Sequence, residues 1–228
     1  MSAVNTAAVV LAGCGRADGA EITEAVSILI HLARHGVAYR CFAPDRAQMH
    51  VVNHATGKHV PGESRNCMVE AARISRGEIS PLSSLDASKF DALYFAGGFG
   101  VAKNLCDFAA AGAGATVDPE GVRVIKAFHA AGKPIGLCCI APVLAANVLG
   151  TKNGGPGCEV TIGNDGGTAE AIASWGSHNI AKSVREAHTD PRNRVITTPA
   201  YMDDAATPFD VFTGIGKMVD GVVELVKK

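Results

Sequence analysis

The chain has 228 residues, of which 47% are hydrophobic and 19% are charged, and this composition excludes an intrinsically disordered protein. Its 21 basic and 22 acidic side chains leave a net charge of −1, which provides no global attraction for nucleic acid or for an anionic membrane. We therefore expect one domain, 1–228, with neither nucleic acid nor membrane among its partners.

The seven cysteines are scattered along the chain, and no two of them form a C-x-x-C pair. The first residues lack the basic start and apolar run of a signal peptide, so we expect free thiols and a cytoplasmic location. A mitochondrial location is the alternative if the chain is eukaryotic and its start has been trimmed. The longest uncharged stretch, 134–151, is interrupted by Gly136, Pro142 and Asn147. It therefore predicts a buried strand that turns into a buried helix, not a membrane span.

The first third of the chain predicts a βαβ unit. The apolar run 7–12 is typical of a strand buried on both faces. Apolar side chains then recur at helical spacing from Ile22 to Ala33, with Glu21 and Glu24 in the first turn, where negative charge suits the helix dipole. A second strand follows at 37–43. We expect a right-handed crossover between the two strands.

The next segment, about 46–88, departs from this alternation. Residues 50–60 are typical of a small hairpin, and 63–76 predict a helix. Because the segment is too short to hold a core of its own, we interpret it as an insertion in the single domain.

The alternation then resumes and continues to the end of the chain. The predicted strands are 91–96, 135–138, 159–162 and 194–198, and the predicted helices are one from about 102, then 119–130, 140–149, 168–175 and 211–226. Strands that alternate with helices predict a three-layer α/β sandwich with a mainly parallel central sheet.

The strongest chemical pattern is the stretch Gly136-Leu137-Cys138-Cys139-Ile140-Ala141-Pro142, where a buried strand runs into a helix with almost no loop. Such an elbow lifts one side chain above the carboxyl edge of the sheet. The small Ala141 two residues on favours Cys139 as the apex and Cys138 as a buried strand residue. Helix-terminal amides predict a lowered pKa for this thiol. The alternative is that both cysteines are ordinary core residues.

A nucleophilic thiol also needs an oxyanion site and a proton carrier. Gly97-Gly98-Phe99-Gly100 follows a predicted strand, so the amides of Gly98 and Ile140 could converge on an oxyanion, although a plain turn is the alternative. The loop does not match G-x-G-x-x-G, so dinucleotide binding is not supported. The candidate proton carriers are Glu21 and Glu24, whose ordinary role would be charge at a helix start.

The eight histidines give weaker indications. His50, His54 and His59 lie in the insertion without a cysteine or carboxylate cluster, so we expect solvated hairpin residues and no metal site. His188 precedes a late strand and is a weak candidate for the carboxyl edge. Asp165 is interpreted as a turn residue.

The sequence resembles the ElbB-like (enhancing lycopene biosynthesis) family of the PfpI and class I glutamine amidotransferase-like superfamily over nearly its whole length. The matching segments are Ala12-Gly13-Cys14-Gly15, Asp18-Gly19-Ala20-Glu21-Ile22-Thr23-Glu24, Phe42-Ala43-Pro44-Asp45, Glu63-Ser64-Arg65-Asn66, Ala71-Ala72-Arg73-Ile74, Gly97-Gly98-Phe99-Gly100-Val101-Ala102-Lys103-Asn104, Cys139-Ile140-Ala141-Pro142 and Thr197-Thr198-Pro199-Ala200-Tyr201-Met202. The resemblance implies a flavodoxin-like, amidotransferase-like fold. It further implies Cys139 as the nucleophile, Glu24 as the carboxylate beside it, and a homodimer. The activity described for ElbB relatives is a glyoxalase that converts glyoxal to glycolate without glutathione, and some related activities are called deglycase.

Two positions depart from the wider superfamily. Ile140 stands where many relatives carry histidine, and Thr197-Thr198-Pro199-Ala200 contains no His-x-Glu pair. The resemblance, taken together with these departures, implies a cofactor-independent glyoxalase that acts on a small dicarbonyl through a Cys139 hemithioacetal. The alternatives are a redox-sensing or partner-binding protein with an oxidisable cysteine, and a hydrolase of the amidase or deglycase type.

Overall fold

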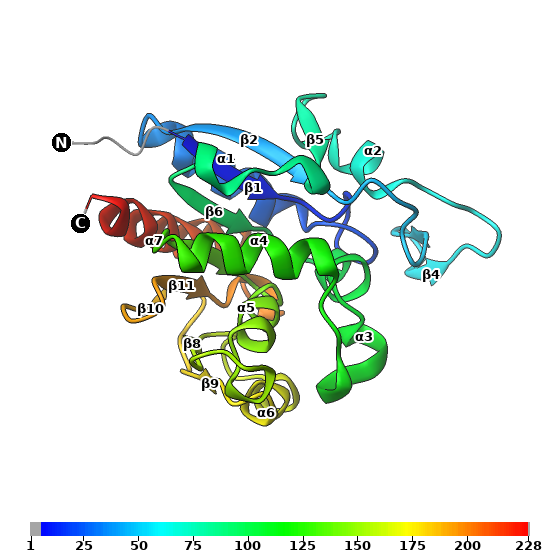
Figure 1. The fold of residues 1–228 in the computed structure, drawn as a ribbon. Coiled ribbons are helices and arrows are strands. Elements are labelled where there is room, and N and C mark those ends of the chain that lie inside the picture. Colours follow the sequence, from blue (N-terminus) through cyan, green and yellow to red (C-terminus); the bar gives the residue numbers. More distant parts are fainter. Residues whose placement is uncertain (1–5, 228) are drawn as a thin grey trace.

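The computed structural model describes residues 6–227, and a seven-stranded sheet lies at its centre (Figure 1). The strand order is β10-β11-β7-β6-β1-β2-β5, and every neighbouring pair is parallel except β10 and β11. The mainly parallel sheet predicted from the sequence is confirmed. Its strands are β1 (Thr6–Val10), β2 (Ala38–Ala43), β5 (Ile79–Pro81), β6 (Ala92–Phe95), β7 (Ile135–Cys138), β10 (His188–Asp190) and β11 (Val195–Thr198).

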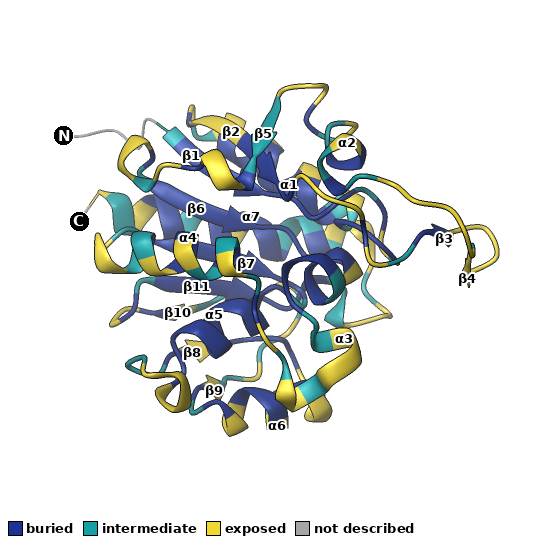
Figure 2. Ribbon diagram, turned by 45° about the vertical axis from the view of Figure 1, so that its right-hand side comes forward, coloured by how far each residue is buried: buried dark blue, intermediate teal, exposed yellow. Residues whose placement is uncertain are grey.

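Helices cover both faces of this sheet and make three layers. Alternate residues of β1 face opposite ways: Ala7 and Val9 join the core beneath α1 and α7, whereas Ala8 and Val10 join the core beneath α4 and α5. Figure 2 shows β6 and β7 as buried, with exposed residues on the outer faces of the helices. The helices are α1 (Ile22–Arg34), α2 (Cys67–Ala71), α3 (Phe108–Ala111), α4 (Pro119–Ala130), α5 (Pro142–Val148), α6 (Gly166–Ser174) and α7 (Pro208–Val226).

The insertion predicted at 46–88 contains more than a hairpin and a helix. The hairpin is confirmed as β3 (Val52–Asn53) paired with β4 (Lys58–His59), and it projects from the body of the molecule in Figures 1 and 2. The predicted helix 63–76 is shorter, because Asn66 caps α2 and the chain then turns through left-handed residues at Arg76 and Gly77. That turn leads into β5, which pairs with β2 at the edge of the main sheet.

The second half differs from prediction in three places. The helix expected from about 102 is a π-helical turn, Val101–Leu105, followed by the four-residue α3. The strand expected at 159–162 is β8 (Glu159–Val160), which pairs with β9 (His178–Asn179) in a separate small sheet. The edge strand β10 was not predicted. Within residues 6–227, no helix has both the length and the apolar character required to cross a bilayer.

Candidate active site

The elbow between β7 and α5 places two cysteines at the carboxyl edge of the sheet. Cys138 ends β7, and Cys139 has a φ of 57°, in the left-handed region that non-glycine residues rarely occupy. The amide of Cys139 donates to the carbonyl of Thr198 at 3.0 Å, so the neighbouring strand β11 holds this turn. A residue keeps such a conformation only where its surroundings enforce it, and these positions concentrate at functional sites.

Glu24 brings a carboxyl group to both thiols. It lies in the first turn of α1 and is fully buried, and the side chain of Glu21 caps that turn by accepting from the Glu24 amide at 2.8 Å. One carboxyl oxygen of Glu24 accepts from the Cys138 thiol at 3.7 Å, and the carboxyl group also hydrogen-bonds the Cys139 thiol. Of the two glutamates considered from the sequence, Glu24 is the one in contact with the sulfurs, and Glu21 is the helix cap.

The loop after β6 closes the site from the other side. Gly97 packs so tightly that a Cβ there would lie 2.4 Å from Glu24 Oε2 and 2.5 Å from the Cβ of Cys139. Gly98 follows with a φ of 89°. The amides of Gly98 and Ile140 both hydrogen-bond the Cys139 sulfur. The structure thus brings together all four predicted site residues, Cys139, Glu24, Gly98 and Ile140.

The ionisation of these groups differs from prediction. Burial, reinforced by the nearby Glu24 carboxylate, raises the pKa of the Cys139 thiol well above its ordinary value, although the Gly98 and Ile140 amides act to lower it. The predicted lowering of this pKa is therefore wrong. The predicted effect came from a helix start, but α5 has only seven residues, and desolvation beside a carboxylate outweighs its amides.

The pKa of the Glu24 carboxyl is also raised. Burial and the charge of Glu21 raise the pKa of the Glu24 carboxyl to about 8, against opposing hydrogen bonds from the Tyr201 amide and the two thiols. A carboxyl group with this pKa exchanges its proton near neutral pH, which suits a general acid and base. Cys139 is 8% exposed as a residue, so little of it is open to solvent.

Sequence reasoning missed two contributors to the site. The Tyr201 amide donates to Glu24 Oε1 at 3.3 Å, and it follows Ala200, another left-handed residue with a φ of 46°. The contact of Cys138 with Glu24 was not predicted, because Cys138 was interpreted only as a buried strand residue. Tyr201 lies in a segment that resembles the family, but a backbone donor leaves no residue-type pattern to find.

The other residues singled out in the sequence lie outside this site. His188 Nε2 is 3.0 Å from Glu159 Oε2, and Asp165 caps α6 by accepting from the Thr168 amide. The rings of His50 and His59 contact one another, whereas His54 accepts from the Ala17 amide. Among residues 6–227, no three histidine, cysteine or acidic side chains gather as a metal site.

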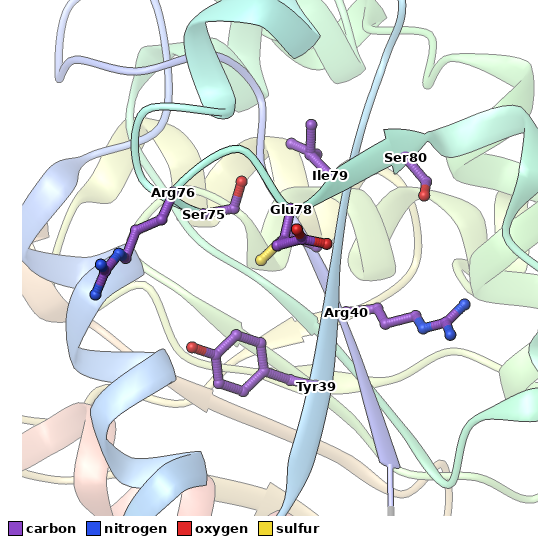
Figure 3. A pocket seen from close by; sticks show the side chains of 8 residues that line it. Tyr39, Arg40, Ser75, Arg76, Glu78, Ile79 and Ser80 are labelled. Carbon is purple, nitrogen blue, oxygen red and sulfur yellow. The ribbon is translucent and has the colours of Figure 1, made fainter.

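A large surface cavity lies away from Cys139. It has a volume of about 700 Å³ and lies near the amino ends of β2 and β5. Its lining includes Tyr39, Arg40, Arg76 and Glu78. Figure 3 shows the guanidinium groups of Arg40 and Arg76 pointing away from each other, so the two cations do not converge on one ligand. A smaller cavity of about 340 Å³ is lined by residues 46–49, 103–107 and 116–119. Neither cavity is lined by Cys139 or Glu24.

Comparisons with known proteins agree with this architecture. No protein-family model matches the sequence. The chain is 51% identical over 230 residues to the human "Glutamine amidotransferase-like class 1 domain-containing protein 3, mitochondrial", covering 97% of this chain and 83% of that protein. It is 49% identical to the "ES1 protein homolog, mitochondrial" of Rattus norvegicus, covering 97% of this chain and 84% of that protein.

Solved structures share the fold. A crystal structure from Ehrlichia chaffeensis, described as an isoprenoid biosynthesis protein with an amidotransferase-like domain, superimposes with a TM-score of 0.89 at 35% identity, covering 97% of this chain and 99% of that one. Drosophila melanogaster DJ-1beta, at 15% identity, has the same fold with a TM-score of 0.52, covering 98% of this chain and 96% of that one. The chain therefore belongs to the family of the ES1 proteins and the glutamine amidotransferase-like class 1 domain-containing proteins.

Proposed function

We propose that this protein is a glyoxalase that converts glyoxal, or a similar small dicarbonyl, to the corresponding hydroxy acid without glutathione. The observation that carries the proposal is one buried carboxyl group, that of Glu24, in hydrogen-bond contact with the thiol at the elbow. A family with an amidotransferase-like fold is compatible with cysteine chemistry in general. Among the reactions of a cysteine nucleophile considered for this chain, the glyoxalase reaction needs only a thiol, a carboxyl group and amide donors.

The first proposed step is the addition of Cys139 to one aldehyde carbon of glyoxal. The C–S bond forms while the C=O π bond opens, and the thiol proton passes through Glu24 to the new oxygen, which gives a hemithioacetal. The Gly98 and Ile140 amides, which contact the sulfur in the free protein, are the donors available to stabilise the developing oxyanion. Thiolate forms only as the sulfur reacts, which is consistent with its raised pKa.

The second proposed step moves one proton between the two carbons. Ionised Glu24 removes the hydrogen from the carbon that bears sulfur, and the resulting enediol takes a proton at the neighbouring carbon. The first carbon is thereby oxidised to a thioester and the second reduced to an alcohol, so no external oxidant is needed. Water then cleaves the thioester, which releases glycolate and restores the Cys139 thiol. Positioned proton transfer of this kind contributes about 10²–10⁴-fold to a rate.

The direct test is glycolate formation from glyoxal, followed by proton NMR in D₂O. The proposal predicts turnover well above a protein-free control and incorporation of deuterium at the hydroxyl-bearing carbon, because Glu24 exchanges its proton with solvent. Equal glycolate formation by Cys139→Ala and wild type would reject the assignment.

A redox sensor is the competing function from the sequence, and one observation opposes it. The pKa of the Cys139 thiol is raised, whereas oxidation by peroxide needs a thiolate. Mass spectrometry after mild peroxide separates the two functions. Selective oxidation of Cys139 together with negligible glycolate formation would favour sensing.

Hydrolysis of an amide is the third possibility. Among the described residues, the hydrogen-bond partners of Glu24 and Cys139 include no histidine, the usual proton carrier for a leaving amine. We therefore expect no ammonia release from glutamine, a result that a coupled ammonia assay would check.

The names of the relatives also bear on the cellular location. The human and rat proteins are named as mitochondrial, and these names give no support to the cytoplasmic prediction. We propose a mitochondrial location for the chain in a eukaryotic cell, to be checked by fractionation.

A homodimer is the remaining proposal, and α1 offers a surface for it. Ile22, Val26 and Ile30 are exposed at four-residue spacing along one face of α1. Light scattering of wild type should give twice the mass of the monomer, and Ile30→Asp should lower it. A monomeric wild type would refute the proposal.

A further inference from the structure

Cys138 is a second thiol at the elbow for which the proposed reaction has no use. Its residue is fully buried, and its sulfur lies 3.7 Å from Glu24 Oε2 and 3.7 Å from the carbonyl oxygen of Phe95. The Gly97 amide hydrogen-bonds the same sulfur. The Cys138 thiol is thus held from three sides, and one of them is the carboxyl group that contacts Cys139.

The left-handed conformation of Cys139 explains this arrangement. Successive residues of a strand normally point to opposite faces of the sheet. At the end of β7 the chain turns with a φ of 57°, and both Cys138 and Cys139 belong to the core on the α1 and α7 side. Two consecutive sulfurs therefore face one glutamate, and a pair of this kind would not arise in a regular strand.

The Cys138 thiol has one hydrogen and two acceptors at equal distance. A charged acceptor forms the stronger bond, so ionised Glu24 attracts this hydrogen more than the Phe95 carbonyl does. When Glu24 carries a proton, the carbonyl becomes the better acceptor. The thiol can therefore rotate between the two acceptors as the carboxyl group changes charge.

We propose that Cys138 is a positioning residue: its thiol donates to Glu24 Oε2, fixes that carboxyl group beside Cys139 and favours its ionised form. The groups that face Glu24 are Glu21 from the start of α1, the two thiols from the elbow and the Tyr201 amide from the segment before α7. Glu21 opposes the ionised form by its charge, and the other three favour it. The inference deepens the proposed function, and for turnover it rests on that function.

The test measures the titration of Glu24 directly. In protein labelled with ¹³C at glutamate carboxyl groups, the Glu24 signal is identified by its loss in Glu24→Gln. In Cys138→Ala, which has no donor, the midpoint should move up by about 0.5–1 pH unit. In Cys138→Ser, which keeps a donor of similar size, the midpoint should stay near that of wild type. In Glu21→Gln, which removes the like charge, it should move down.

Turnover provides the second measurement. If glycolate forms as proposed, the rate at pH 7 should fall about 3–10-fold in Cys138→Ala, and the fall should vanish above the new midpoint. A loss of packing alone would lower the rate at every pH. Unchanged midpoints in Cys138→Ala, or equal shifts in the alanine and serine variants, would overturn the inference. The NMR titration does not depend on turnover, so it tests the inference even if the protein forms no glycolate. Failure of the inference and failure of the proposed function are therefore distinguishable.

Discussion

Two left-handed residues with almost the same backbone angle lie in very different surroundings. Cys139 has a φ of 57° and Arg76 a φ of 58°. Cys139 is buried, its amide is bound to β11, and its sulfur meets a carboxyl group and two amides. Arg76 is exposed in the turn before β5, beside the larger cavity, and its guanidinium group points away from that of Arg40 (Figure 3). Neither backbone strain nor cavity size distinguishes the candidate site, whereas the convergence of protonatable groups on Cys139 does.

The largest expected effect is the difference in turnover between variants of two buried thiols, Cys139 at the elbow and Cys41 beside the larger cavity. Cys139→Ala should lower glycolate formation on the order of 10³-fold, because it removes the proposed nucleophile. Cys41→Ala, at the buried thiol that lines the larger cavity, is the matched control and should stay within about two-fold of wild type. A larger loss in the Cys41 variant would show that the cavity contributes to the reaction.

Glu24→Gln should lower turnover by about 10²–10⁴-fold, since the amide cannot move a proton between carbons. In wild type the rate should rise with pH and level off above an apparent pKa near 8, because the ionised carboxylate is the base. A pH–rate profile of kcat checks this. A flat profile between pH 6 and 9 would assign the proton transfer to another group.

The same buried carboxyl group should make stability depend on pH. Its pKa is about 8 in the folded protein and near 4.5 when unfolded, so the folded state binds the proton more tightly. The resulting stability is fully present below pH 4.5 and is lost as pH rises through 8. As pH rises from 5 to 9, the unfolding free energy of wild type should therefore fall by roughly 3–5 kcal/mol relative to that of Glu24→Gln. Urea denaturation at each pH measures this difference. A constant difference would contradict the burial of a titrating carboxyl.

Gly97→Ala tests how closely the site is packed. The added Cβ would meet Glu24, the Cβ of Cys139 and the Cys138 carbonyl at less than 3 Å. We expect turnover to fall at least about ten-fold and the free energy of unfolding to fall by about 1–3 kcal/mol. Gly114→Ala, where nothing lies within 4 Å and φ is not positive, should change neither. Thermal melts and the glyoxal assay check both variants.

The smallest expected effect is at Arg76, the exposed left-handed residue. Arg76→Gly relieves a left-handed conformation without removing a buried contact, so it should raise the free energy of unfolding by about 0.5–1 kcal/mol and leave turnover unchanged. A loss of activity in this variant would mean that the turn before β5 supports the site in some way that its geometry does not reveal.

The sequence predicts the long, strongly patterned parts of this fold and misses the short ones. The apolar run of β1 and the helical spacing of α1 determine their elements locally. By contrast, β5 and β10 have three residues each, and β5 ends in proline while β10 is His-Thr-Asp. Their pairing depends on neighbours that only the folded sheet supplies.

The residues of the candidate site could be proposed from the sequence, but their environment could not. The elbow pattern identified Cys139, and resemblance selected Glu24 over Glu21. In the structure, helical phase explains the difference, because Glu21 is the cap and Glu24 is buried one turn later. The direction of the thiol pKa was wrong, because desolvation comes from packing by α1 and the β6 loop, which no local pattern reports.

The bond between the Tyr201 amide and Glu24 joins residues 177 positions apart. During synthesis, Cys139 therefore leaves the ribosome well before this donor to its partner glutamate exists. A nascent or truncated chain carries every cysteine of the site without the complete set of contacts around Glu24. The arrangement thus delays full assembly of the site until residue 201 has been made.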